Sequence, residues 1–333
     1  MSELRKDPVI DRWVIVSDAP VRIPTITNEK KPVIALEGVC PFCPGSEHMC
    51  PPEIYANRQP YSHANDSRWN LRVIPSRAPV LMVEEELKRS GEGMYDRITG
   101  IGANEVIIET PRHNIRQSSM SHEELNNVFW AYRDRSVDLK KDSRMKFILI
   151  FKNCGTEAGA TIEHPYSLLM GLPIVPRGII EEFEGARKHF EYKERCIYCD
   201  IINQEKQQEL RVVSENRDFL AIEPFAPRSP FETWILPKRH SARFESIEPA
   251  EIHELAIIFK EVMKRMDLAL NYPAYNYMIH TSPVVSGNEY FYHWHIEILP
   301  RMSVITGLEW ASDLYVNPTS PEEAAAFLRE MSV

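Results

Sequence analysis

The chain has 333 residues, of which 43% are hydrophobic and 26% are charged, and its formal net charge is −9. This composition is typical of a globular protein with room for two domains, and the acidic balance argues against the basic surface that nucleic-acid binding requires, so we expect no nucleic-acid partner. The chain has no apolar run long enough for a membrane span and no signal-peptide pattern, so we expect a cytoplasmic protein with no membrane partner.

The first half of the chain predicts short strands, one helix and a knuckle with two cysteines. A short N-terminal strand precedes a loop at Pro24 and Pro32, and a tight knuckle follows between Cys40 and Cys43. A capping box that begins at Ser121 opens a helix to about residue 139, and residues 84–103 form a polar excursion. The further strands expected in this half are 70–75, 79–83, 105–110, 145–151 and 168–175.

The second half predicts the same elements in the same order. Residues 177–195 suit a linking helix, and a second knuckle then runs from Cys196 to Cys199. Pro249 opens a helix to about residue 270. The strands expected in this half are 219–222, the segment from 232 that ends at His240, 275–280 and 292–300.

The repeated order of elements predicts an internal duplication. In each half the order is a knuckle, a strand, a strand that ends in histidine, a helix, a strand, and a last strand segment that carries H-x-[H/Y]. The two histidines are 51 residues apart in the first half (His113 to His164) and 53 in the second (His240 to His293). The sequence therefore predicts two α+β half-domains, 1–176 and 177–333, related by a pseudo-two-fold axis.

Each half also supplies two cysteines and two histidines at equivalent positions. In a reducing compartment, C-x-x-C pairs are typical of metal or redox sites rather than disulfides. Two thiolates and two imidazoles suit tetrahedral zinc in a structural role, so we predict one or two zinc ions per chain. The predicted ligand sets are Cys40, Cys43, His113 and His164 in the first half, and Cys196, Cys199, His240 and His293 in the second.

The second half allows another metal set. An iron-type ion with nitrogen and oxygen ligands would use Glu182, His280, His293 and His295. His293 cannot easily serve both sets, and the available cysteine pair favours the zinc set.

Taken together, these motifs resemble the galactose-1-phosphate uridylyltransferase family of the histidine-triad superfamily. The resemblance covers nearly the whole chain and is carried by residues 40–45, 103–113, 153–165, 230–240 and 292–297. It implies tandem histidine-triad-like half-domains, with antiparallel sheets and flanking helices, in a homodimer. It also implies a role in galactose or carbohydrate metabolism, with a nucleotide or nucleotide-sugar ligand and ping-pong transfer through a nucleotidyl-histidine intermediate.

The sequence departs from the family at the centre of its signature. The family pattern is His-Pro-His-x-Gln, whereas this chain has His164-Pro165-Tyr166-Ser167-Leu168, so Tyr166 occupies the position of the attacking histidine. A phenol with a pKa of about 10 is mostly protonated at neutral pH, and transfer by the family's mechanism should be severely impaired.

Three interpretations follow from this departure. The chemistry has changed around Tyr166, it has moved to His295 with Glu297 as its partner, or the protein binds a nucleotide sugar without catalysis. The His293-Trp294-His295-Ile296-Glu297 run alternates in the strand period, which places its two histidines and the glutamate on one face. The residues that the resemblance implies for substrate binding are Ser76, Arg77, Asn153, Gly155, Ser167, Glu309 and Asn317.

Overall fold

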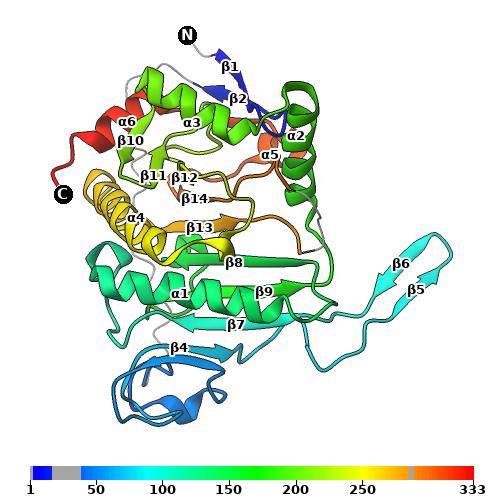
Figure 1. Cartoon of the computed structure of the whole chain (residues 1–333), viewed down its shortest axis with the longest axis vertical. Coiled ribbons are helices and arrows are strands. Elements are labelled where there is room, and N and C mark those ends of the chain that lie inside the picture. The colour runs from blue at the N-terminus through cyan, green and yellow to red at the C-terminus, as the bar shows by residue number, and fades with distance from the viewer. Residues whose placement is uncertain (1–2, 17–38, 285–288) are drawn as a thin grey trace.

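The computed structural model describes residues 3–16, 39–284 and 289–333, so the loop expected at Pro24 and Pro32 lies outside the described residues. A ten-stranded antiparallel sheet runs through the whole molecule (Figure 1). Its strands in spatial order are β10 (Val212–Glu215), β11 (Phe219–Ile222), β12 (Thr233–Pro237), β14 (His295–Pro300), β13 (Tyr275–His280), β8 (Phe147–Cys154), β9 (Tyr166–Leu172), β7 (Ala103–Ile108), β4 (Trp69–Pro75) and β3 (Tyr55–Arg58).

The strand order contains the predicted repeat. Read from either edge toward the middle, β10-β11-β12-β14-β13 matches β3-β4-β7-β9-β8 strand for strand. The two halves meet where β13 pairs with β8, with Asn276 opposite Asn153 in the register. The fold is therefore the predicted α+β class, and the strands of both halves join in one continuous sheet.

Two long helices cover one face of the sheet. The helices α1 (His122–Leu139) and α4 (Pro249–Ala269) occupy equivalent places in the two halves (Figure 1). They contact each other through Phe129 and Phe259, whose rings meet edge to face with 5.4 Å between centroids. Burial of this apolar layer is the main stabilising term of the fold, because the largest buried cluster lies between these helices and the sheet.

The opposite face of the sheet carries the chemically interesting residues. Strand alternation places Tyr166 and His295 on this face, away from α1 and α4. In the second half, α2 (Arg177–Lys193) and α3 (Ile197–Gln208) cover part of it, with Ile197 and Ile202 packed against Trp234 and neighbouring strand residues.

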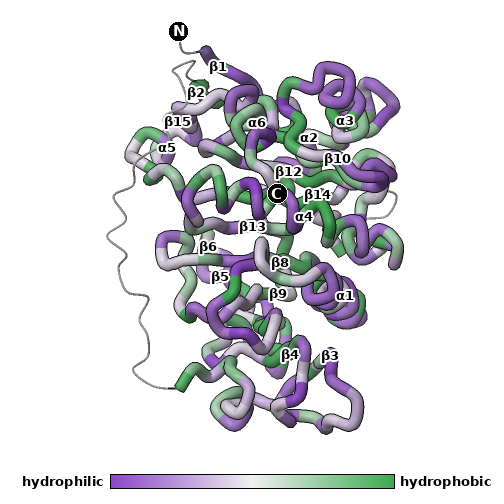
Figure 2. The backbone as a smooth tube through the Cα atoms, turned by 90° about the vertical axis from the view of Figure 1, so that its left-hand side faces the viewer, coloured by the Kyte–Doolittle hydropathy of each residue, from purple (hydrophilic) through white to green (hydrophobic). Residues whose placement is uncertain are grey.

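Smaller elements surround the main sheet. A three-stranded sheet joins the N-terminal strands to a late one, and the β5–β6 hairpin projects from the body (Figure 1). That hairpin is fully exposed and mostly hydrophilic (Figure 2). The remaining elements are β1 (Glu3–Lys6), β2 (Trp13–Val16), β5 (Arg89–Glu92), β6 (Tyr95–Ile98), β15 (Tyr315–Asn317), α5 (Gly307–Ser312), α6 (Pro321–Arg329) and the 3-10 turns Glu47–Met49, Gln117–Ser119, Thr156–Ala158 and Phe244–Ser246. No helix in the described ranges is long and apolar enough to cross a membrane.

Several expected element boundaries are corrected by the structure. The strand expected over 168–175 begins at Tyr166 and ends at Leu172, because Pro173 cannot donate to the ladder. Residues 79–83 form no strand, and only a single bridge joins Met82 to Ile101. The second knuckle is the first turn of α3 rather than a loop, with Cys196 at the N-cap position.

A buried ion pair lies behind Tyr166. Lys152 Nζ donates to Glu109 Oε2 at 2.8 Å and to the carbonyl oxygen of Tyr166 at 2.9 Å. Both side chains are almost completely buried. A buried charge without a partner carries a large desolvation cost. An ionised Glu109 carboxylate would therefore destabilise the fold if Lys152 were absent.

Replacing Lys152 with methionine is expected to lower the free energy of unfolding by about 3–5 kcal/mol, since it leaves the Glu109 carboxylate unpaired. Denaturant titration would measure the loss. The double variant Lys152→Met with Glu109→Gln removes both charges and should be more stable than the single variant. A single variant as stable as the unmodified protein would show that the pair does not stabilise this part of the sheet.

Candidate functional site

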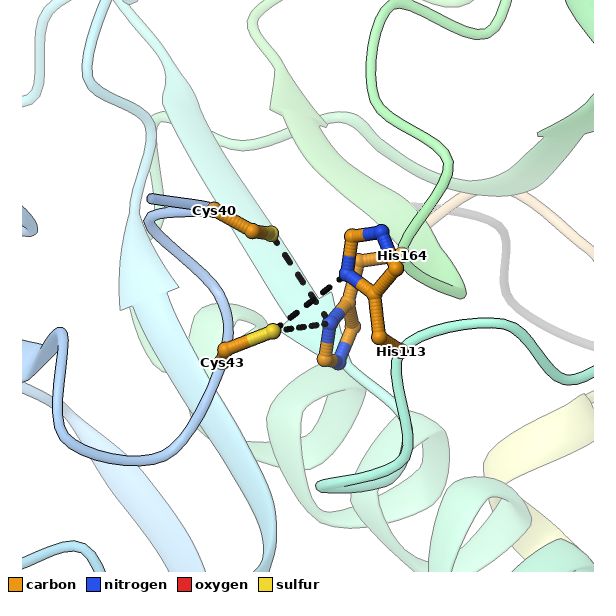
Figure 3. Close-up of side chains that lie close together, drawn as sticks. All are labelled: Cys40, Cys43, His113 and His164. Carbon is orange, nitrogen blue, oxygen red and sulfur yellow. Dashed lines mark hydrogen bonds between the residues drawn. The ribbon is translucent and has the colours of Figure 1, made fainter. Parts of the chain in front are cut away.

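The first cysteine–histidine set comes together at one end of β9. Cys40 and Cys43 lie in a tight turn, His113 follows β7, and His164 immediately precedes β9 (Figure 3). Cys43 Sγ lies 3.3 Å from His113 Nδ1 and 3.6 Å from His164 Nδ1, and Cys40 Sγ lies 3.9 Å from His164 Nδ1. A tetrahedral zinc ion holds sulphur and nitrogen ligands ~3.6 Å apart, so these four atoms fit zinc.

The surroundings of this set also suit a cation. His164 Nε2 donates to the carbonyl oxygen of Thr110 at 2.7 Å, which leaves the lone pair of Nδ1 directed at the cysteines. Burial raises the pKa of the Cys43 thiol to about 11. A thiolate at this position therefore requires a neighbouring positive charge.

The second half repeats this geometry. Cys199 Sγ lies 3.5 Å from His240 Nδ1 and 3.6 Å from His293 Nδ1, and His293 Nε2 donates to the carbonyl oxygen of Pro237 at 2.8 Å. Together with Cys196, these residues form the second predicted set, whose ligand atoms all lie within 4.8 Å of one another. The donor types and spacing fit zinc in both halves.

A third cluster contains Glu182, His280 and His295, whose ligand atoms also lie within 4.8 Å of one another. The iron alternative is corrected in one respect: His293 belongs to the cysteine set, because its Nδ1 faces Cys199 and its Nε2 is bonded to Pro237. Without His293, the remaining three residues still offer two nitrogens and a carboxylate, which suits a divalent transition metal.

Charges within this third cluster balance one another. His280 Nδ1 lies 2.6 Å from Glu182 Oε2, and its Nε2 lies 3.4 Å from Glu297 Oε2. Burial alone would lower the pKa of His280, but Glu297 and Glu182 outweigh it and raise that pKa to about 10. Arg228 donates to Glu297, so the side chains of Arg228 and His280 face the two carboxylates beside His295.

His295 is placed as a nucleophile would be. Its Nδ1 donates to the carbonyl oxygen of His293 at 3.2 Å, which fixes the tautomer with a lone pair on Nε2. Nε2 is buried and has no hydrogen-bond partner among the described residues. His295 lines a cavity of about 370 Å³, and its Nε2 lies 3.7 Å from Glu182 Oε1 and from Glu297 Oε1.

Tyr166 occupies the equivalent strand position in the first half, but its surroundings differ. Its ring meets Phe42 edge to face and belongs to an apolar cluster with Ile108 and Trp69. The backbone N–H of Thr161 donates to the phenol oxygen at 3.3 Å. The side chain of Tyr166 is 7% exposed, and its phenol already has a partner.

Two of the residues expected to bind substrate are buried in the core of the structure. Ser167 is buried on the opposite face, where it accepts a hydrogen bond from Tyr132 at 2.7 Å, and Asn317 is buried with its amide bonded to the carbonyl oxygen of Pro227. These contacts place both residues in the core, and their contact with a ligand stays a prediction.

The other expected binding residues remain near open surface. Asn153 lies on the face of Tyr166, and its amide oxygen accepts from Asn276. Gly155 has a φ of +87°, and a Cβ there would lie 2.7 Å from that of Ala274, so close packing requires this glycine. The three remaining residues are Ser76, which accepts from the Ala78 N–H, the exposed Arg77, and Glu309, which caps α5.

Two tyrosines that the sequence analysis did not identify complete the third cluster. The hydroxyls of Tyr198 and Tyr292 donate to Glu182 Oε1 at 2.5 Å and 2.7 Å. Their positions offered a signal, since Tyr198 lies inside the second C-x-x-C pair and Tyr292 directly precedes His293. They fix the orientation of Glu182 beside His295.

Comparisons with known proteins give a consistent result over the whole chain. Residues 1–180 match the family profile described as galactose-1-phosphate uridyl transferase, N-terminal domain, and residues 182–308 match the C-terminal domain of the same family. An ADP-glucose phosphorylase of Arabidopsis thaliana is 35% identical over 99% of this chain and 93% of that protein. A galactose-1-phosphate uridylyltransferase of Thermotoga maritima is 30% identical over 100% and 99%.

Solved structures agree with the sequence matches. The crystal structure of an Arabidopsis thaliana ADP-glucose phosphorylase with bound ADP-glucose superposes with a TM-score of 0.83 at 34% identity, and covers 100% of both chains. A uridylyltransferase structure gives a TM-score of 0.76 at 26% identity, over 99% of this chain and 97% of the other.

Proposed function

Because this chain belongs to the galactose-1-phosphate uridyl transferase family, we propose that it transfers a nucleotidyl group from a nucleoside diphosphate sugar, with His295 as the nucleophile. The observation that carries this proposal is that His295 lines a cavity while its buried Nε2 has no hydrogen-bond partner among the described residues. Relatives that act on sugar nucleotides supply the reaction class, and the proposal places the protein in carbohydrate metabolism.

The proposed step balances as a substitution at phosphorus. His295 Nε2 forms a bond to the α-phosphorus, the bond from that phosphorus to the bridging oxygen breaks, and the sugar phosphate leaves with the electron pair. The Nδ1–H bond to the His293 carbonyl stabilises the positive charge that develops on the imidazole. A second phosphate then attacks the phosphoramidate and regenerates His295.

The charges beside His295 act in opposite directions. The carboxylates of Glu182 and Glu297 stabilise an imidazolium but repel an incoming phosphate, whereas Arg228 and His280 attract the phosphate. This balance favours the covalent intermediate once it forms, because the intermediate carries positive charge on the ring.

A second candidate function is nucleotide-sugar binding without transfer. The observation that favours it is the absence of a histidine at Tyr166, together with two carboxylates 3.7 Å from His295 Nε2. In this case the third cluster of Glu182, His280 and His295 holds a metal ion and stabilises the fold.

Exchange assays separate the two candidates. The purified protein is incubated with labelled phosphate or sugar 1-phosphate and a panel of UDP-, ADP- and GDP-sugars. The proposal expects label to enter the nucleotide sugar for at least one member of the panel. Binding by calorimetry with no exchange across the panel would select the binding protein.

We also propose a homodimer in the cytoplasm, with one zinc ion in each cysteine–histidine set. A cytoplasmic location suits the six cysteines, which are all free. The surface around α5 supports the dimer, because it exposes large apolar side chains next to one another: Val304, Leu308 and Trp310 are 82%, 45% and 79% exposed.

Replacing Trp310 with glutamate is expected to convert the dimer into a monomer, because a charge at the centre of an apolar interface must be desolvated. Sedimentation velocity would give the mass in solution. Tyr192→Glu is the matched control, since Tyr192 is 80% exposed and lies near the C-terminal end of α2. A dimer that survives Trp310→Glu, or an unmodified protein that sediments as a monomer, would contradict the proposed interface.

A further inference from the structure

His295 Nε2 is buried, although its proposed role requires contact with a phosphorus atom. It lies 3.7 Å from the Glu182 carboxylate and 3.7 Å from the Glu297 carboxylate. The Trp234 ring lies 5.1 Å from the His295 ring, centroid to centroid. A substitution reaction needs its two reacting atoms at about 3–3.5 Å before the bond forms. Part of the wall around His295 must therefore move before a substrate can react.

One segment of this wall comes from the other end of the sequence. Residues 7–12 form the turn of the hairpin between β1 and β2, and several of them, including Asp7 and Val9, line the cavity that His295 also lines. A larger cavity of about 740 Å³ lies next to it, between this turn, α3 and β11. Asp7 and Trp234 line both cavities. The turn therefore lies at the boundary between the two cavities.

The hydrogen bonds of this turn are internal. The backbone N–H of Asp7 donates to the carbonyl oxygen of Arg12 at 2.7 Å. Asp7 Oδ1 accepts from the backbone N–H groups of Val9 and Ile10, at 2.9 Å and 3.2 Å. Within the described chain, residues 7–12 have no hydrogen bond to any element outside their own hairpin. The turn can therefore move as a unit without leaving a buried hydrogen-bonding group unpaired.

Packing against α2 holds the turn in place. Val9 is 4% exposed and belongs to an apolar cluster that includes side chains of α2 and α3. Its backbone lies directly against Gly185 of α2, where a Cβ would come within 1.7 Å of the Val9 carbonyl oxygen. An ion pair of 3.7 Å joins Asp11 to Lys188, and it contributes little because both side chains are exposed. The close contact at Gly185 is possible only because this helix position has no side chain.

We propose that the turn of residues 7–12 is a gate over His295. The structure shows the gate closed, with Val9 packed against Gly185. When the turn swings away from α2, Val9 leaves the apolar cluster and Asp7 leaves the wall that the two cavities share. The larger cavity then joins the cavity that His295 lines, and a substrate enters by this route. The role of the gate in transfer rests on the proposed function, whereas its opening is a property of the fold.

Thiol labelling measures the opening of the gate. Val9→Cys places a thiol at the buried position of the turn. Val14→Cys is the matched control, because Val14 is equally buried but lies on β2, which stays paired with β1 and β15. Labelling with a maleimide, followed by peptide mass spectrometry, gives the rate at each position apart from the native cysteines. Position 9 should be labelled about tenfold faster than position 14 or more, because only the turn opens. Equal rates at the two positions would overturn the gate.

A second pair of variants tests the contact between the turn and α2. Gly185→Ala puts a methyl group where the Val9 carbonyl oxygen lies, and it should raise the labelling rate of Val9→Cys by about tenfold or more. Gly178→Ala is the matched control on the same helix, since a Cβ at Gly178 meets no other group of the described chain within 4 Å. It should leave the labelling rate unchanged. Equal rates in the two glycine variants would overturn the assignment of Gly185 as the seat of the gate.

A cross-link connects the gate with the proposed reaction. Asp11→Cys and Lys188→Cys, bridged by a short bis-maleimide, fix the turn to α2 at a point where neither residue lines a cavity. The bridged protein should transfer about tenfold more slowly or less, whereas the unbridged double variant and the treated Asp11→Cys variant should keep their rates. Fast labelling of Val9→Cys, with no transfer by the unmodified protein, would keep the gate and defeat the reaction. Full transfer by the bridged protein would keep the reaction and defeat the gate.

Discussion

Replacing His295 with alanine is expected to lower the rate of nucleotidyl transfer by about 10³-fold or more, whereas Tyr166→Phe should leave the rate within about twofold of the unmodified protein. The reason is the difference between two equivalent strand positions. His295 lines a cavity and its Nε2 has no hydrogen bond within the described chain, whereas the Tyr166 phenol accepts from Thr161 and lies among apolar side chains. Initial rates of label exchange measure both variants.

A structural role for His295 must be separated from a chemical one. His295→Gln keeps much of the volume and a polar tip but has no nucleophilic nitrogen, so it should be as inactive as His295→Ala. Both variants must keep the zinc content and the thermal midpoint of the unmodified protein. Loss of activity in Tyr166→Phe alone would return the chemistry to the first half and overturn the assignment.

Replacing Cys43 with serine is expected to remove one zinc ion per chain and to lower the thermal midpoint by about 10 °C or more, because a structural zinc site contributes its binding free energy to folding. The Cys43 sulphur lies close to both histidines of its set, so its loss removes one of the four expected metal ligands. A zinc ion bound here would tie the Cys40–Cys43 turn to His113, which follows β7, and His164, which precedes β9. Metal analysis and calorimetric melting provide the two measurements.

Cys50 provides the matched control for this prediction. Its thiol lies close by but donates to the carbonyl oxygen of Pro41 at 3.2 Å and belongs to neither metal set. Cys50→Ser should therefore retain the zinc content of the unmodified protein. Fewer than one metal ion per unmodified chain would refute both zinc centres, and equal zinc loss in Cys43→Ser and Cys50→Ser would refute this ligand assignment.

The two metal sets and the repeat are the features that a sequence reveals best. Cys40 and His164 lie far apart in the chain, but the equal spacing of the second copy indicated that each pair belongs to one centre. Strand alternation also placed His295 and Glu297 on one face, as the structure has them. These features depend on the alternation of residues along a strand and on the repeated spacing of motifs, and both can be read directly from a sequence.

Other features depend on packing between distant segments. Alternation alone did not show which face of β9 meets α1, so the hydrogen bond between Ser167 and Tyr132 could not be predicted. The contacts of Tyr198 and Tyr292 with Glu182 require α2, α3 and the segment before β14 to meet.

The continuous sheet offers a physical reason why chemistry can change halves. Tyr166 and His295 occupy corresponding places on β9 and β14, on one face of the same sheet. Tyr166 follows His164 by two residues, and His295 follows His293 by two residues. Each strand is therefore preceded by a histidine of a cysteine–histidine set. A duplicated fold thus provides two scaffolds for one nucleophile, and substitution at Tyr166 leaves the second intact.

Mass spectrometry of the trapped covalent intermediate tests the central claim most directly. The protein is mixed with the nucleoside diphosphate sugar that supports exchange, quenched under alkaline conditions that preserve a phosphoramidate, and digested. The account predicts a nucleotidyl group on the peptide that contains His295, and none on the peptide that contains Tyr166. A nucleotidyl group on Tyr166, or turnover with no labelled peptide, would contradict it.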